Sequence, residues 1–393
     1  MKKIAAFVTA LALFVVCIIA FHYYSEDRIA TNNPNFGTWI SKEKDLSYEA
    51  VKANTHEDTV LMLGSSEFQH GRKTPYHPSW IFRRQNMDVM CIGAAYNQSL
   101  SHTITLASIA PELKSKKVVL LLSPSWFNKH GVKEEAFSIR FSESQYIAMM
   151  ENPHIKEETK AAVTERVLTL LARDKEMKKR VQKYRDVYLG SGGILDRIFL
   201  EARKKFVREK EIAMVSEAWI ASGQKNYKKY EPPAPVKENP DWAALEDRAE
   251  VEYVQQPQNR FHMIDKFYRE KIVPRMKDKR QSDLQKSYGT SPEYGDLRLF
   301  LDVCRQENVD ICLVLLPVNG YWYDYTGFPR EGRQQFVKKV ENIAQEYNVE
   351  TCNLFNEGYT PGFLEDAVHP AGKGWVRINE EVYKFFRQGK TSA

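Results

Sequence analysis

Short, mostly apolar runs alternate with longer amphipathic stretches in the first and last parts of the chain. Such runs occupy residues 60–63, 87–92, 117–122, 311–316 and 350–354. Continuous apolar runs are typical of strands that are covered on both faces, and residues 97–113 have apolar side chains at helical spacing. This alternation predicts an α/β fold, with a flavodoxin-like parallel sheet of about five strands flanked by helices.

The pattern changes between residues 131 and 288, where charged residues become frequent and strand-like runs disappear. Val163 and Val167, for example, recur at a spacing of four, which places them on one face of a helix. We therefore predict a large helical insertion at residues 131–288. It would divide the sheet domain into a first part, residues 58–130, and a second part, residues 289–393.

The amino terminus has the pattern of a membrane-spanning segment. Lys2 and Lys3 precede residues 4–21, which carry no charge and are long enough to cross the hydrocarbon core as a helix. A cleaved secretory signal is the alternative, but such a signal ends at small residues, whereas this run ends at bulky side chains. The sequence thus predicts a single-pass membrane anchor at residues 1–24, with the rest of the chain on the extracytoplasmic side by the positive-inside rule. Residues 25–57 would form a connector.

Candidate chemistry follows the first predicted strand. Gly64, Ser65 and Ser66 form a turn at the carboxyl end of that strand, which is where open α/β sheets place their active sites. The competing interpretation is a simple turn with a helix cap, since serine is a common capping residue. Asp366 and His369 lie late in the chain and could supply an orienting acid and a base for one of the two serines. The joint presence of these segments favours a catalytic Ser-His-Asp arrangement.

Two further stretches follow predicted strands at the same edge of the sheet. Gly93, Asn97 and Gln98 come after the second strand and could donate hydrogen bonds to a developing oxyanion, beside the backbone N–H of the attacking serine. Their alternative role is a turn with a helix cap. Trp322 and Tyr323 follow the fourth strand and would lie at the rim of the pocket, where aromatic rings with polar tips suit a lipid-linked polymer. A tyrosine-rich loop that packs on its own sheet explains this stretch equally well.

Charge and composition narrow the classes of partner. The 393-residue chain has a net charge of +6, a mild excess that favours a polyanionic partner or a membrane surface. The sequence has no zinc-finger, zinc-knuckle or RNA-binding signature, so we expect no nucleic-acid partner. It also lacks Cys-x-x-Cys and His-Glu-x-x-His spacings, so we expect neither a metal site nor a cofactor.

These motifs resemble a known family. A strand followed by Gly-x-Ser near the start and Asp-x-x-His near the end is similar to the SGNH hydrolase pattern, in which the second residue after the glycine, here Ser66, is the nucleophile. The usual Gly-x-Asn block of that pattern is not reproduced after Gly93. More narrowly, the chain resembles DltD, the D-alanine transfer protein family of Gram-positive bacteria, over nearly its whole length. The stretches that carry this resemblance are Gly64 to Glu67, Ser123 to Phe127, Leu316 to Gly327 and Asp366 to His369.

The resemblance implies an SGNH-like fold and a role in the transfer of D-alanyl esters to lipoteichoic acid. It also implies two partners of the same pathway, a D-alanyl carrier protein and a membrane-bound O-acyltransferase. Two other hypotheses stay open from the residues alone. The chain could be an esterase or thioesterase that uses water as acceptor, or a non-catalytic scaffold that binds the carrier protein or the polymer.

Overall fold

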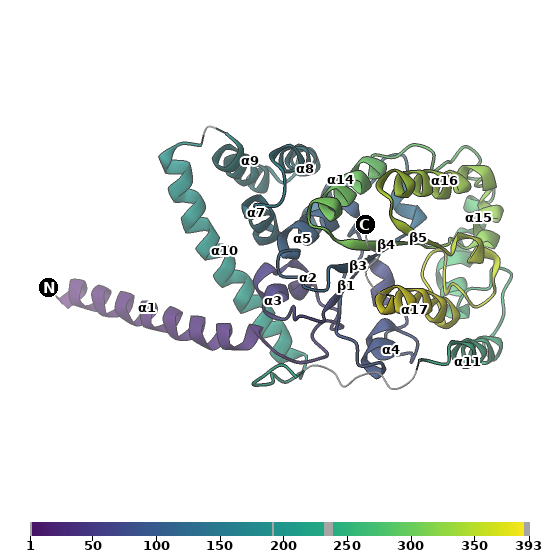
Figure 1. Ribbon diagram of the computed structural model, residues 1–393, viewed down its shortest axis with the longest axis horizontal. Helices are drawn as coiled ribbons and strands as arrows, with labels where there is room; N and C mark the ends of the chain where they lie inside the picture. The colour runs from purple at the N-terminus through teal and green to yellow at the C-terminus, as the bar shows by residue number, and fades with distance from the viewer. Residues whose placement is uncertain (1, 191, 232–238, 389–393) are drawn as a thin grey trace.

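A five-stranded parallel sheet forms the centre of the molecule in the computed structural model (Figure 1). The structure describes residues 2–190, 192–231 and 239–388. The strand order is β2-β1-β3-β4-β5, which is the flavodoxin-like order of doubly wound folds. The strands are β1 (Val60–Leu63), β2 (Val89–Ile92), β3 (Lys117–Leu122), β4 (Asp310–Leu315) and β5 (Glu350–Asn353). The predicted fold class is thereby confirmed.

The helices surround this sheet and form most of the remaining structure. Before β4 the α-helices are α1 (Lys2–Ile29), α2 (Lys42–Leu46), α3 (Tyr48–Ala53), α4 (Pro78–Arg84), α5 (Ser99–Ile109), α6 (Glu134–Arg140), α7 (Glu143–Glu151), α8 (Glu157–Leu170), α9 (Lys175–Leu189), α10 (Ile194–Ala221), α11 (Trp242–Val254), α12 (Asp265–Phe267), α13 (Met276–Lys279) and α14 (Glu293–Gln306). After β4 they are α15 (Gly320–Thr326), α16 (Arg330–Tyr347) and α17 (Gly372–Arg387). Short 3-10 or π segments are η1 (Ser66–Gln69), η2 (Pro124–Phe127), η3 (Tyr268–Ile272), η4 (Val273–Arg275) and η5 (Phe355–Tyr359).

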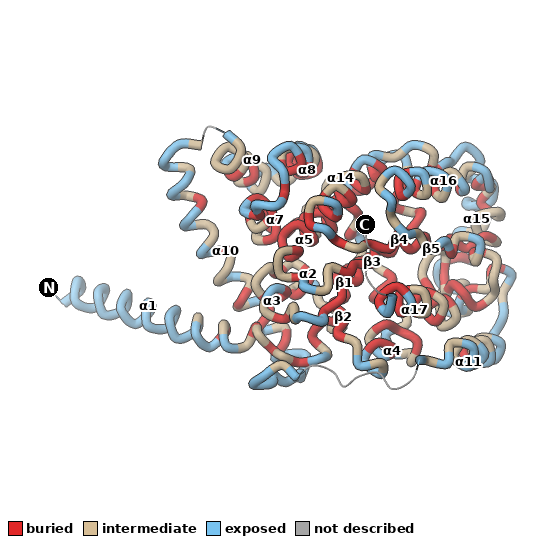
Figure 2. Tube along the Cα trace, viewed as in Figure 1, coloured by how far each residue is buried: buried red, intermediate tan, exposed pale blue. Residues whose placement is uncertain are grey.

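Alternate residues of each strand enter two different apolar layers, because successive side chains of a strand point to opposite faces. Leu61 and Leu63 of β1 pack in the cluster that includes residues of α5, α14 and α16. Met62 packs in the other cluster, with residues of α4 and α17. Strands β1 to β4 are almost entirely buried (Figure 2), which explains why their sequences are nearly continuous apolar runs, whereas β5 is exposed or half-buried.

The helical segment between β3 and β4 interrupts the sheet in sequence but not in space. Strands β3 and β4 pair in parallel along six positions, from Lys117 with Asp310 to Leu122 with Leu315. Between these strands, the described residues form helices and loops and contain no strand. The expectation that the third and fourth strands share one sheet, with a helical insertion between them, is confirmed.

Helix α1 is long and apolar enough to cross a membrane, by length and composition. Its apolar residues are exposed, and most of the helix has the exposed colour in Figure 2. Its final turns pack on α10, where Arg208 pairs with Glu26 at 2.6 Å and Ser216 donates to the carbonyl of Ser25 at 2.9 Å. The helix fits a single-pass membrane anchor and continues past the predicted end at residue 24, to Ile29.

The segment expected as a connector, residues 25–57, includes α2 and α3. Lys44 is fully buried, and its ammonium donates to the carbonyl oxygens of Gly37 and Cys91 at 2.9 and 2.6 Å. Asp45 is also buried and lies beside it, with 3.8 Å between the ammonium nitrogen and a carboxylate oxygen. This pair ties the segment to the end of β2.

Candidate active site

Two glycines allow the ends of β1 and β2 to approach closely where the candidate serines begin. A Cβ atom on Gly93 would lie 2.2 Å from the carbonyl oxygen of Gly64. A Cβ atom on Gly64 would lie 2.4 Å from a carboxylate oxygen of Glu67. Neither position can hold a larger residue without movement of its neighbours. The turn therefore leads directly from β1 into η1, with Ser66 as its first residue.

The structure brings together Ser66, His369 and Asp366, the three residues singled out from the sequence. The hydroxyl oxygen of Ser66 lies 2.8 Å from Nε2 of His369. On the opposite side of the ring, Nδ1 of His369 lies 2.7 Å from Oδ2 of Asp366. The other carboxylate oxygen of Asp366 accepts the backbone N–H groups of Val368 and His369 at 2.9 and 2.8 Å. A carboxylate in this position fixes the tautomer in which Nε2 is free to accept a proton.

The electrostatics of the pair suit a base that becomes a cation. Burial alone would raise the pKa of Asp366, but the hydrogen bond from His369 and those from two backbone N–H groups lower the pKa below its usual 3.8. Burial alone would lower the pKa of His369, but the bond to Asp366 and its negative charge raise the pKa above 6.5. The site therefore favours the imidazolium that would form when the ring accepts a proton.

Ser65 and Ser66 have different surroundings. Ser65 is buried, its hydroxyl donates to the carbonyl of Ala94 at 3.1 Å, and its backbone N–H donates to Glu67 at 2.7 Å. Ser66 is half-buried, and its hydroxyl faces the imidazole. Of the two serines, Ser66 has the hydroxyl that contacts His369, whereas the hydroxyl and N–H of Ser65 are both bonded to groups near the turn.

The residues proposed as oxyanion donors lie in the loop between β2 and α5. The backbone N–H of Gly93 donates to Asp45 at 3.2 Å and is therefore engaged in this structure. Oδ1 of Asn97 accepts the N–H of Ala94 at 3.1 Å, which directs its amide NH₂ away from that turn. Gln98 is the N-cap residue of α5 but makes no side-chain capping bond. In the part of the chain that the structure describes, neither the Asn97 amide NH₂ nor the backbone N–H of Ser66 has an acceptor.

His102, on α5, contacts the turn at Gly64 and was not identified from the sequence. Its Nε2 donates to the carbonyl of Gly64 at 2.8 Å, and the ring is fully buried against Trp126. Burial lowers the pKa of His102 to about 4, so the ring is neutral at physiological pH. Since its position on α5 gives it no distinctive motif, only the packing reveals this role.

A cavity of about 760 Å³ lies at the carboxyl edge of the sheet, between the loop after β3 and helix α15. Trp322 and Tyr323 line this cavity, whereas Ser66, Asp366 and His369 are not among its lining residues. Tyr321 and Tyr325 instead donate their hydroxyls to carbonyl oxygens of the protein at 2.8 Å, so part of the aromatic stretch is structural. Exposed cationic and imidazole side chains surround the opening: Lys129, His130, Lys279 and Lys286.

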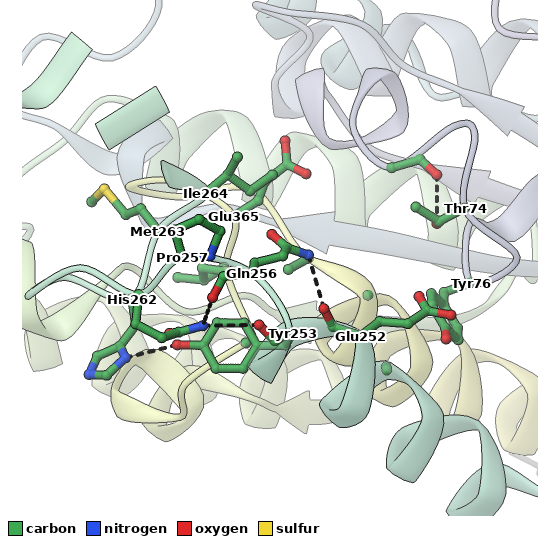
Figure 3. Close-up of a pocket in the computed structure, with 17 residues that line it drawn as sticks. Thr74, Tyr76, Glu252, Tyr253, Gln256, Pro257, His262, Met263, Ile264 and Glu365 are labelled. Atoms are coloured by element: carbon green, nitrogen blue, oxygen red, sulfur yellow. Dashed lines mark hydrogen bonds between the residues drawn. The ribbon is translucent and has the colours of Figure 1, made fainter. Parts of the chain in front are cut away.

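A smaller cavity of about 110 Å³ is lined in part by Glu365, the residue that precedes Asp366 (Figure 3). Glu365 lines it together with Tyr76 and His262. Neither Glu365 nor His70 was evident from the sequence; the ring of His70 stacks on that of His369 with 3.7 Å between centroids. The acid directly before Asp366, in Glu-Asp-x-x-His, is the sequence signal that could have pointed to this pair.

Three side chains at the site, His70, Asp366 and His369, have potential ligand atoms within 4.8 Å of one another. The two imidazole rings are parallel within 7° and stacked. The lone pair of an imidazole nitrogen lies in the plane of its ring, so two stacked rings cannot direct their lone pairs at one ion between them. This geometry fits a hydrogen-bonded site better than a metal centre.

The fold and the site define an α/β protein with a serine–histidine–aspartate arrangement at the carboxyl edge of a parallel sheet. The chain belongs to the DltD family, since the family model described as DltD protein matches residues 33–387. It is similar to Protein DltD of Bacillus subtilis (strain 168), with 29% identity over 335 residues, which cover 84% of this chain and 83% of that protein. Protein DltD of Staphylococcus aureus (strain NCTC 8325 / PS 47) is 27% identical over 83% of this chain and 80% of its own length. Protein DltD of Lacticaseibacillus rhamnosus is 25% identical over 90% of this chain and 82% of its own length.

Proposed function

We propose that this protein is a membrane-anchored serine acyl-transfer enzyme that acts in the D-alanylation of lipoteichoic or teichoic acid. The observation that carries the proposal is the continuous hydrogen-bonded chain from Ser66 through His369 to Asp366. Family membership supports the pathway, and the geometry supports the chemistry. We further propose that the catalytic domain lies on the extracytoplasmic side, because Lys2 and Lys3 precede the apolar part of α1.

In the first half-reaction, the hydroxyl oxygen of Ser66 attacks the carbonyl carbon of an activated acyl donor. Nε2 of His369 accepts the hydroxyl proton, and the Asp366 carboxylate stabilises the imidazolium. The backbone N–H of Ser66 and the side-chain amide of Asn97 are the donors that we assign to the tetrahedral oxyanion. Gly93 and Gln98 lie in the same loop, but the N–H of Gly93 is already bonded to Asp45, so we assign it no donor role. Collapse of the intermediate breaks the bond to the leaving group, which takes the proton from His369, and leaves an acyl ester on Ser66.

In the second half-reaction, a hydroxyl group of the acceptor attacks the acyl ester. His369 takes the proton of that hydroxyl and returns it to the oxygen of Ser66 when the acyl–serine bond breaks. Strands β1, β3 and β4 are neighbours in the sheet; Ser66 follows β1, and the large cavity is lined in part by residues that follow β3 and β4. Its cationic opening and its aromatic wall of Trp322 and Tyr323 fit a phosphate-bearing polymer.

The donor side of the proposal rests on the family. We propose that the acyl group reaches this enzyme through a D-alanyl carrier protein and a membrane-bound O-acyltransferase of the same pathway. The membrane anchor would keep Ser66 close to that acyltransferase and to a lipid-linked acceptor. The chemistry requires no cofactor, because each proton is carried by His369.

Product analysis tests transfer against hydrolysis. The full-length protein in detergent is incubated with a labelled D-alanyl thioester and purified lipoteichoic acid, beside the Ser66→Ala variant. We expect label on the polymer with the unmodified protein and none with Ser66→Ala. Free labelled D-alanine without polymer label would favour an esterase or thioesterase, whereas equal polymer alanylation by Ser66→Ala in cells would favour a scaffold.

The cationic opening gives a second test of the acceptor. The double variant Lys129→Gln with Lys279→Gln should lower transfer to the polymer and weaken its salt dependence, because fewer phosphates are paired. Hydrolysis of a small neutral ester should not change, since Ser66 and His369 are untouched. Lys175→Gln with Lys179→Gln on α9 is the matched control, and a similar loss of transfer there would contradict a specific acceptor site.

A further inference from the structure

The catalytic imidazole has a second imidazole on its face. His70 lies just after η1, and its ring stacks on that of His369 with 3.7 Å between centroids and 7° between planes. Contact at this distance leaves no room for water between the rings. One face of His369 is therefore covered by His70, while its two nitrogens face Ser66 and Asp366.

His70 has its own carboxylate partner. Its Nδ1 is hydrogen-bonded to the Glu365 carboxylate, which accepts. Glu365 directly precedes Asp366, so the two stacked rings are each paired with one of two consecutive acids. The site contains two parallel histidine–carboxylate pairs.

Several contacts fix the backbone that carries the second pair. The carbonyl of His70 accepts the indole N–H of Trp375 at 3.2 Å, from a ring that is fully buried. The N–H of Glu365 donates to the carbonyl of His369 at 2.9 Å, and its own carbonyl accepts the N–H of Ile264 at 2.8 Å. The ring of His70 thus projects from a fixed backbone on one side and is held by a fixed carboxylate on the other.

One hydrogen bond to Asp366 fixes the nitrogen of His369 but leaves its ring plane free to tilt about that bond. Such a tilt would move Nε2 away from the hydroxyl of Ser66 without breaking the contact with Asp366. A ring stacked on the face of His369 opposes this tilt. We propose that His70 and Glu365 form a positioning pair that holds the plane of the catalytic imidazole, an inference that rests on the proposed function.

The pair also contributes charge. Three carboxylates, those of Asp366, Glu67 and Glu365, interact electrostatically with His369, and each of them raises the pKa of the His369 imidazole. When His369 takes the proton of Ser66, the Glu365 carboxylate is one of the anions that stabilise the resulting imidazolium. Removal of that charge should therefore lower the pKa of His369 and make it a weaker base.

The test compares three variants of the full-length protein for hydrolysis of a small ester and for the rate of labelling by a fluorophosphonate. His70→Ala removes the stacked ring and its hydrogen bond. His70→Phe restores a stacking ring without the hydrogen bond. Glu365→Gln keeps a hydrogen-bond partner but removes its charge. His56→Ala is the matched control, since that ring also stacks, on Tyr230 at 3.5 Å, and pairs with Asp88, but lies before β1 at the opposite edge of the sheet.

We expect His70→Ala to lower kcat about 10- to 100-fold with little change in KM, the loss typical of a misplaced catalytic group. His70→Phe should recover at least part of this loss, and Glu365→Gln should move the acid limb of the kcat/KM profile to lower pH. His56→Ala should change neither quantity. Circular dichroism of each variant checks that the fold is retained.

Two results would overturn the inference while Ser66→Ala and His369→Ala remain inactive, as the proposed function requires. The first is kcat within twofold of the unmodified protein in folded His70→Ala, together with an unchanged pH profile in Glu365→Gln. The second is a loss in His70→Ala that folded His70→Phe does not relieve at all, because the stacked ring would then play no part. Full activity in Ser66→Ala would overturn both the inference and the proposed function.

Discussion

Replacement of Asp366 by Asn tests how the imidazole is held. In the structure, one oxygen of Asp366 accepts the N–H groups of Val368 and His369, and the other accepts Nδ1–H of His369. An asparagine can keep the first two bonds through its carbonyl oxygen. Its NH₂ group then faces Nδ1, which must be unprotonated to accept a hydrogen bond. The ring would be held with its proton on Nε2, where it cannot take the proton of Ser66.

We expect a large loss of kcat, although the hydrogen bonds from the backbone N–H groups of the loop survive. The same exchange of the triad aspartate in a serine protease lowers kcat about 10⁴-fold. At about 1.4 kcal/mol for each factor of ten, this loss corresponds to roughly 5.5 kcal/mol of transition-state stabilisation. A residual rate should remain, because the hydroxyl of Ser66 and the oxyanion donors are unchanged.

The assay is turnover of a small ester, with fluorophosphonate labelling of Ser66 as a second readout and circular dichroism as a check of folding. Asp88→Asn is the matched control, because Asp88 also pairs with a histidine ring, His56 at 3.1 Å, but at the opposite edge of the sheet. Activity of Asp366→Asn within tenfold of the unmodified protein would refute the assigned role of Asp366. A similar loss in Asp88→Asn would show that the effect is not specific to the site.

Three further predictions follow from the same structure. Ester turnover should fall as pH decreases through a value above 6.5, because Asp366 raises the pKa of His369 and only the neutral ring accepts a proton; a limb near 4 in the kcat/KM profile would contradict this assignment. The contribution of His369 to folding stability has the opposite pH dependence: it is present below pH 6.5 and is lost as pH rises through the raised pKa of this residue. The contribution of Asp366 to folding stability is present above pH 3.8 and is lost as pH falls through its lowered pKa. Gly93→Ala should destabilise the protein by about 1–3 kcal/mol in denaturant unfolding, because its Cβ would lie 2.2 Å from the Gly64 carbonyl oxygen. Gly295→Ala, in α14 with no atom within 4 Å of its Cβ, should instead stabilise by about 0.5–1 kcal/mol, and equal effects of the two changes would contradict the close approach at Gly93. Protease added to intact protoplasts should degrade the domain after α1, and full protection would place that domain in the cytoplasm.

The sheet could be predicted from the sequence because its strands are buried on both faces. A parallel strand covered by helices is apolar at nearly every position, so the apolar runs indicate where β1 and β3 lie, although β3 begins at the charged Lys117. The weakest prediction was β5, whose residues are exposed or half-buried, and the structure ends it at Asn353 rather than residue 354. The parallel direction of the strands followed from the alternation with helices, because parallel neighbours require crossover connections.

The site could be predicted only in part. Ser66, Asp366 and His369 sit next to strand ends or in short motifs, so their types and spacing were informative. His70 and Glu365 meet across 295 residues of sequence, through two loops that the apolar pattern does not describe. The bond between Asp45 and the N–H of Gly93 was hidden for the same reason, since it joins the segment before β1 to the end of β2. Such contacts between loops depend on how the elements pack, which neither periodicity nor residue type records.

The central claim is that Ser66 carries the acyl group between donor and acceptor. It is tested most directly by rapid acid quenching of the full-length protein after mixing with a labelled D-alanyl thioester, followed by peptide mass spectrometry. We predict a D-alanyl ester on the hydroxyl of Ser66 that disappears when lipoteichoic acid is added, and no adduct in Ser66→Ala. An adduct on Ser65, or transfer to the polymer by Ser66→Ala at an undiminished rate, would contradict it.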